Sequence, residues 1–211
     1  MSPKKEARKI QASTIIENLK IRGMEGYYFD TSADCVSYIL SQMPQGSSIS
    51  WGGSMTFEET GMKDALTDQD YVLIDRMSAK TPEERRSIYA QTVMSDFYFM
   101  STNAITLDGE LINIDGNGNR LACLLQGPQN IMILTGLNKI TSDIESGIRR
   151  VKDIASPANT VRLNKNTPCS QTGRCNNCFS PDCICSHTVI TRRSGTPGRI
   201  KIFLINEDLG Y

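Results

Sequence analysis

The sequence predicts an α/β fold built on a mainly parallel β-sheet. Short apolar segments typical of buried strands alternate along the chain with segments whose apolar residues recur at helical spacing. This alternation indicates strand–helix–strand units and hence a mainly parallel sheet. Turn residues near positions 109 and 117 add an antiparallel meander in the middle of the chain.

The length and charge of the chain indicate a single globular domain and argue against some classes of partner. The chain has 211 residues, enough for one large domain that folds without disulfides. Its 23 basic and 23 acidic side chains balance, which argues against nucleic acid or an anionic membrane as partner. The charged first residues do not resemble a signal peptide, and no apolar run approaches the ~20 residues that span a bilayer. We therefore expect a cytoplasmic protein.

In the first half of the chain, helices are expected over residues 3–23, 33–43 and 82–94. Glycine and proline end the first two, and the third begins with Thr81, Pro82 and the capping-box residue Glu84. Strands are expected over residues 26–30, 47–51, 71–75 and 96–100, the apolar run at 71–75 being typical of a buried strand.

The second half of the chain contains more turns. Asp108-Gly109 predicts a hairpin whose return strand covers residues 111–114. Ser142 and Glu145 predict the capping box of a helix whose apolar residues extend to Ile154. Further strands are expected over residues 121–125, 131–134, 187–191 and 199–205.

The segment Ser47 to Leu66 is the centre of the predicted arrangement. Ser47 to Trp51 form the end of a strand, Gly52-Gly53 form a turn, and Ser54 begins a helix. Such a turn before a helix start suits an anion, whether phosphate, carboxylate or oxyanion. The alternative is a tight connection in which Ser54 only caps the helix.

Five of the seven cysteines fall in the pattern Cys169-x5-Cys175-x2-Cys178-x4-Cys183-x-Cys185. In a reducing cytosol, thiols this crowded indicate a four-sulfur site for Zn²⁺ or an iron–sulfur cluster. His187, the only histidine, is interpreted as a bystander, and the isolated Cys35 and Cys123 as small buried residues.

A second polar group is Asn103, Thr106, Asp115, Asn117, Asn119 and Arg120. If the meander folds back over the Gly52-Gly53 turn, Arg120 could pair with a carboxylate or phosphate held there. Lys139 is a further candidate anion contact, or else the solvated end of a strand. Glu59 either complements the dipole of its helix or serves as an acid–base group. No Ser/His/Asp set, HExxH motif or Walker loop is present.

Taken together, these motifs resemble the lactate-utilisation (LUD domain) family, on the branch with a cysteine-rich C-terminal segment. The resemblance covers most of the chain from about residue 40 onward. The residues that carry it are Gly52 to Thr56, Glu59, Gly61, Asn103 to Thr106, Asp108-Gly109, Asp115 to Arg120, Gly127-Pro128, Gly136, Asn138-Lys139, Pro168-Cys169, Thr172-Gly173, Cys175, Cys178, Ser180 to Asp182, Cys185 and Glu207 to Tyr211.

The resemblance implies an open α/β sheet similar to that of the phosphosugar-isomerase and CoA-transferase (NagB/RpiA-like) superfamily. It also implies a component of organic-acid oxidation of the lactate-to-pyruvate type, acting beside iron–sulfur partner proteins. The family pattern has four cysteines, which makes Cys169, Cys175, Cys178 and Cys185 the expected metal ligands and Cys183 the spare. The single Cys-x2-Cys pair favours [4Fe–4S] over Zn²⁺, which stays the alternative.

These observations give a definite set of expectations. An α/β domain should cover residues 1–167, a cysteine-rich metal-binding loop 168–186, and returning strands 187–211. Two other roles stay open: a stand-alone enzyme of the isomerase or CoA-transferase type, or an interaction protein with a structural zinc clip. Catalytic candidates are Glu59, Asp115 and Arg120, and the expected ligand-binding residues are Gly52, Gly53, Ser54, Asn103, Thr106, Asn119, Arg120 and Lys139.

Overall fold

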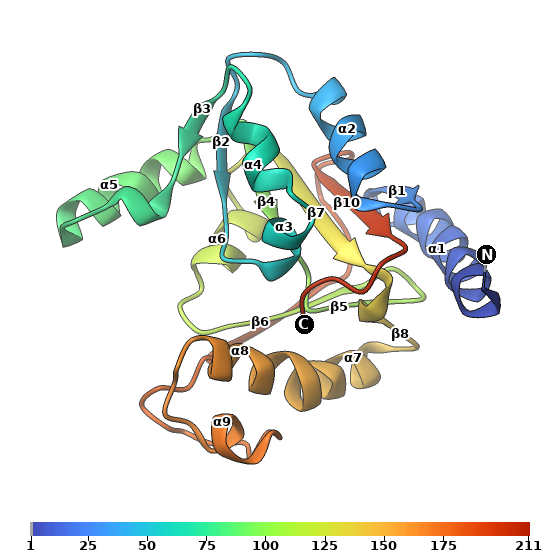
Figure 1. The fold of residues 1–211 in the computed structure, drawn as a ribbon, viewed down its shortest axis with the longest axis vertical. Helices are drawn as coiled ribbons and strands as arrows, with labels where there is room; N and C mark the ends of the chain where they lie inside the picture. Colours follow the sequence, from blue (N-terminus) through green and yellow to red (C-terminus); the bar gives the residue numbers. More distant parts are fainter. Residues whose placement is uncertain (1) are drawn as a thin grey trace.

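The computed structural model describes residues 2–211. Its centre is a six-stranded sheet with the order β1-β10-β7-β4-β2-β3, in which every neighbouring pair is parallel (Figure 1). The predicted α/β fold with an open, mainly parallel sheet is therefore confirmed. The strands are β1 (Glu25–Phe29), β2 (Ser48–Trp51), β3 (Val72–Ile74), β4 (Phe97–Met100), β7 (Asn130–Gly136) and β10 (Ile200–Ile205).

Helices cover both faces of this sheet. Because side chains alternate along a strand, Tyr98 and Met100 of β4 pack on one face, and Phe97 and Phe99 on the other. The first face packs against α1 (Pro3–Ile21) and α6 (Asn119–Leu125), and the second against α2 (Ser32–Gln42), α3 (Met55–Glu59) and α4 (Met62–Thr67). The helix α5 (Pro82–Val93) begins with the predicted capping box.

Among residues 2–211, no helix has the length and apolar character needed to cross a membrane.

A smaller sheet lies beside the first, with the order β8-β5-β6-β9. The predicted hairpin is its antiparallel pair β5 and β6. One continuous helical stretch covers this sheet (Figure 1) and consists of α7 (Ile144–Arg150), the π-helical turn η3 (Val151–Ala155) and α8 (Ser156–Arg162). The other elements are β5 (Ala104–Thr106), β6 (Leu111–Asp115), β8 (Ile140–Thr141), β9 (His187–Thr191), α9 (Pro168–Thr172), η1 (Arg76–Ser78) and η2 (Leu137–Lys139).

Four local predictions need correction. Residues 121–125 belong to α6, because Gly118 takes a left-handed φ of 77° and starts a helix after the turn. The cap of α7 is Asp143, whose carboxylate accepts the Ser146 N–H at 2.7 Å. The strand at 71–75 is the half-exposed edge strand β3. Gly61, with φ 74°, divides the helix after Ser54 into α3 and α4.

Candidate functional site

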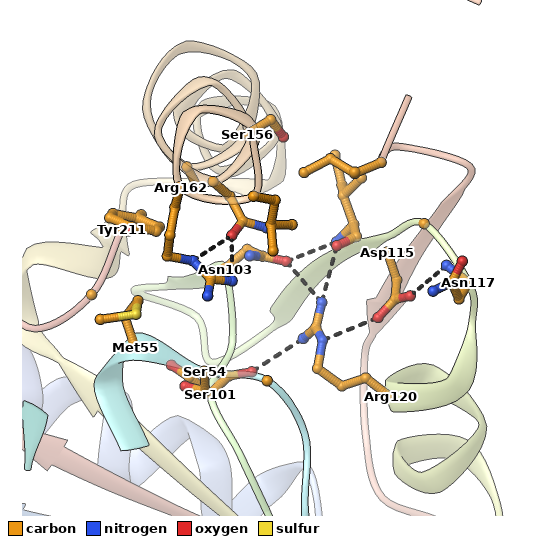
Figure 2. A pocket seen from close by; sticks show the side chains of 18 of the residues that line it. Ser54, Met55, Ser101, Asn103, Asp115, Asn117, Arg120, Ser156, Arg162 and Tyr211 are labelled. Carbon is orange, nitrogen blue, oxygen red and sulfur yellow. Dashed lines mark hydrogen bonds and ion pairs between the residues drawn. The ribbon is translucent and has the colours of Figure 1, made fainter. Parts of the chain in front are cut away.

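A cavity of about 490 Å³ opens between the two sheets and α8 (Figure 2). Its walls come from the chain just after β2, β4, β6 and β7, together with α8 and part of the cysteine segment. Three of these strands belong to the parallel sheet, and open parallel sheets bind their ligands beyond the carboxyl ends of their strands. The cavity therefore lies where this fold class places ligand sites.

Cationic side chains outnumber carboxylates around this cavity. The aspartates that line it are Asp115 and Asp182. Of these two, Asp115 is paired with Arg120 at 3.2 Å, and Asp182 lies 3.7 Å from Lys165. The cations that line it are Arg76, Arg120, Lys139, Arg162 and Lys165. Such an excess favours an anionic ligand.

Arg120 joins the two sheets at the wall of the cavity (Figure 2). Its side chain is only 12% exposed, and all five of its N–H groups have protein acceptors. Burial lowers the pKa of Arg120, and the Asp115 carboxylate opposes this shift. Arg120 therefore acts here as a clamp. The acceptors are Asp115 Oδ2, Asn113 Oδ1, Asn103 Oδ1 and the carbonyl oxygens of Ser101 and Ile114.

Lys139 is the last residue of η2, the turn that directly follows β7, and is 3% exposed. Its Nζ donates to Thr56 Oγ1 at 2.8 Å and to Ser101 Oγ at 3.0 Å. Burial, assisted by the positive charges of Arg150 and Arg120, lowers the pKa of Lys139 to about 7. Within residues 2–211, no carboxylate forms an ion pair with this amine.

The Gly52-Gly53 turn carries the chain from β2 to the edge of the cavity. The Gly52 N–H is already used, since it donates to the Phe99 carbonyl at 2.9 Å. Gly53 lies against Arg76, because a Cβ at this position would come within 2.6 Å of Arg76 Nη2. Ser54 Oγ accepts the Phe57 N–H at 3.3 Å. Ser54 is therefore the N-cap of α3, as predicted from its place after the glycine turn.

The structure brings most of the expected ligand-binding residues to one cavity. Those that line it are Gly53, Ser54, Asn103, Asn119, Arg120 and Lys139. Gly52 and Thr106 lie outside its lining, and the Thr106 hydroxyl hydrogen-bonds the Glu110 carboxylate.

The two carboxylate candidates lie in different places. Asp115 lines the cavity. Its carboxylate accepts hydrogen bonds from the Arg120 guanidinium and from the backbone N–H groups of Asn117 and Gly118. Glu59 lies outside the lining, and its carboxylate accepts the Gly210 N–H at 2.6 Å. That contact ties the C-terminal segment to α3, close to Lys139.

Sequence reasoning missed several lining residues. Ser101 had a usable signal, because it directly follows the buried strand β4. Arg76 and Arg162 had none, since a cation in a short turn or at a helix end has the same local sequence whether or not a cavity lies beside it. Thr56, at the start of α3, becomes informative only through its contact with Lys139.

The cysteine segment forms the outer wall of this region. Cys169 Sγ lies 3.4 Å from Thr160 Oγ1, and Cys185 Sγ donates to Ser156 Oγ at 3.3 Å. Burial raises the pKa of Cys185, and the other thiols Cys183, Cys175 and Cys169 are near enough to raise it further. In the part of the chain that the structure describes, no three His, Cys, Asp or Glu side chains form a metal-binding group. Cysteine thiols are ligands that suit Zn²⁺ or an iron–sulfur cluster. To form a four-sulfur site, the thiols would have to move closer together than they lie here.

Comparisons with known proteins bear on both the fold and the family. The structure of a DUF162 family protein from Deinococcus radiodurans superposes with a TM-score of 0.54 at 12% identity, covering 94% of this chain and 98% of that one. The structure of eIF2B delta from Chaetomium thermophilum superposes with a TM-score of 0.36 at 12% identity, over 56% of this chain and 50% of that one. No curated protein matches the sequence. The LUD domain family matches residues 12–205, and the chain therefore belongs to the LUD domain family.

Proposed function

We propose that this LUD-domain protein binds a small organic acid in the basic cavity and serves as a cytosolic component of lactate-type organic-acid oxidation. The observation that carries the proposal is the excess of cations around the cavity. Its two aspartates are already paired with Arg120 and Lys165, and among residues 2–211 neither Arg76 nor Arg162 forms an ion pair. The anion that such a cavity needs for charge balance would come from a ligand.

Two cations are well placed to meet a carboxylate. Arg162, on α8, extends toward the cavity in Figure 2, and Asn159 Oδ1 accepts its Nε and Nη2 at 3.1 and 2.8 Å. Arg76 has its guanidinium beside Gly53. A guanidinium binds a carboxylate through two parallel hydrogen bonds, which also fixes the orientation of the acid.

The second part of the proposal concerns the cysteine segment. We propose that Cys169, Cys175, Cys178 and Cys185 bind a metal, with [4Fe–4S] favoured over Zn²⁺. A cluster would link the protein to iron–sulfur partner proteins in electron transfer. Several thiolates kept together without disulfides also require a reducing compartment, which supports a cytoplasmic location. No role in nucleic-acid or membrane binding is proposed.

Calorimetric titration with L-lactate, pyruvate and the uncharged lactamide tests the cavity. Both acids should bind, and lactamide should not, because it lacks the charge that the cations recognise. Arg76→Ala should weaken binding about tenfold, or by about 1.4 kcal/mol. The matched control is Arg149→Ala, which removes an exposed cation outside the cavity lining. Equal binding of lactamide, or equal losses in both variants, would contradict the proposal.

A further inference from the structure

We infer that Lys139 is a covalent centre of this cavity, where its amine forms an imine with the keto carbon of a bound 2-oxo acid. The inference rests on the proposed function, because it takes the ligand to be an organic acid. It adds a reaction at Lys139 and a carbonyl group on the ligand.

The position of Lys139 supports this role. Its Nζ is held at a fixed place in the cavity wall by Thr56 Oγ1 at 2.8 Å and Ser101 Oγ at 3.0 Å. These two contacts use two of the three bonding directions of an ammonium group. Within residues 2–211, no protein acceptor takes the third. Lys139 is one of the residues that line the cavity, so a ligand bound there lies next to this amine.

The charges around Lys139 favour the neutral, nucleophilic amine. Arg120 and Arg150 repel a proton on Nζ, and Glu59 is the charged group that opposes them. The Arg150 guanidinium is itself fixed, because it donates to the carbonyl oxygens of Asn103 and Asn138 at 2.7 and 3.1 Å. With a pKa of about 7, a large share of Lys139 is the amine at neutral pH, whereas an ordinary lysine is almost fully protonated.

The reaction balances without an oxidant or reductant. Nζ attacks the keto carbon, a nitrogen–carbon bond forms, and the carbonyl electron pair moves to oxygen. One amine proton passes to that oxygen, and the hydroxyl of Ser101 or Thr56 is placed to relay it. The resulting hydroxyl group then leaves as water with the second amine proton, and an imine remains. Hydrolysis reverses every step.

The ligand class follows from the same contacts. The cations at the cavity wall favour a ligand that has a carboxylate. Imine formation with Lys139 requires that the same ligand also has a carbonyl group. A 2-oxo acid such as pyruvate has both groups on adjacent carbons. Lactate has the same carboxylate with a hydroxyl in place of the carbonyl, so it should bind without reacting. The pair of acids therefore separates anion binding from imine formation.

Trapping with pyruvate and sodium cyanoborohydride tests the inference on the wild-type protein. Peptide mass spectrometry should find the reduced pyruvyl group on Lys139 at a higher occupancy than on any exposed lysine, and none after incubation with lactate. Lys139→Arg should remove the adduct. Lys152→Arg, at a lysine outside the cavity lining, should leave the adduct in place. Trapping on Lys139 should also rise to its half-maximum near pH 7, well below that of the exposed lysines.

The outcomes separate this inference from the proposed function. If pyruvate binds in calorimetry but Lys139 is labelled no more than the exposed lysines, imine formation is excluded and anion binding stands. If neither acid binds, the proposed function fails, and acetaldehyde with cyanoborohydride then probes the amine alone. Selective labelling of Lys139 by acetaldehyde would support the reactive amine, and uniform labelling would overturn it.

Discussion

Asp115 and Arg120 form an ion pair in which both side chains are nearly buried, at 11% and 12% exposure, with 3.2 Å between Oδ2 and Nε. The pair joins the end of β6 to the start of α6. The Arg120 guanidinium also contacts the chain after β4, so one side chain connects the small sheet to the large one.

Replacing Arg120 with Ala should destabilise the protein by about 3–5 kcal/mol, because it leaves the Asp115 carboxylate buried without its cation. Urea unfolding followed by circular dichroism measures this change. The control is Arg149→Ala, which breaks an exposed pair with Glu145 and should cost less than about 0.5 kcal/mol. Similar losses in the two variants would show that Arg120 has no special structural role.

Replacing Lys139 with Met should alter the pH dependence of stability. The folded protein holds the pKa of Lys139 near 7, below the usual 10.5, so the unfolded chain binds the extra proton between these values. Wild-type stability should therefore rise with pH across this window relative to the Met variant. The expected rise is on the order of a few kcal/mol, at about 1.4 kcal/mol for each unit of pKa difference. Parallel curves for the two proteins from pH 7 to 10 would contradict the shifted pKa.

Replacing Gly53 with Val should weaken carboxylate binding about tenfold or more while leaving the fold intact. A Cβ at this position meets the flexible end of Arg76 at 2.6 Å and displaces the guanidinium from the cavity. Gly195→Val is the control, since a Cβ added at Gly195 would meet no atom within 4 Å and the backbone there is not left-handed. Calorimetry with lactate measures the difference, and undiminished affinity in a folded Gly53→Val protein would remove this turn from the site.

Single Cys→Ser variants should identify the metal ligands. Substitution at Cys169, Cys175, Cys178 or Cys185 should each reduce metal content, and Cys183→Ser should retain it. Cys183 and Cys185 are separated by one residue, so in an extended segment their side chains lie on one side only ~7 Å apart, and chelation through both needs a tight bend. Elemental analysis and visible spectra of anaerobically purified protein measure the outcome.

Two results would contradict this assignment. Loss of metal in Cys183→Ser with retention in Cys185→Ser would show that the ligand set is wrong. Zinc without iron in the wild type would instead support a structural zinc clip.

Local patterns predicted the main sheet well because they follow directly from burial. Phe97 to Met100 are apolar without interruption, as expected for a strand with helices on both faces. The error at residues 121–125 arose because a short apolar run fits a strand or a helix equally well. Its helical form depends on Gly118 and on packing against α1 and the sheet, which local sequence does not reveal.

The site was only partly predictable for a related reason. The glycine turn and the polar residues near Asp115 are recognisable by residue type and spacing. The environment of Lys139, in contrast, depends on Thr56, which lies 83 positions away, and on Ser101, 38 positions away. A lysine after a strand has the same local sequence whether it is solvated or enclosed, so its burial could be found only from the structure.

The place of β10 between β1 and β7 has a consequence for biosynthesis. The strand nearest the start of the chain, β1, pairs with β10 alone in the large sheet, and β10 begins only at Ile200. On the ribosome, β1 must therefore wait until residues 200–205 have been translated before it gains a neighbour. During that time β1 and β7 each have an edge without a partner strand, and such an edge can pair with another chain. Premature termination before residue 200 should give insoluble fragments.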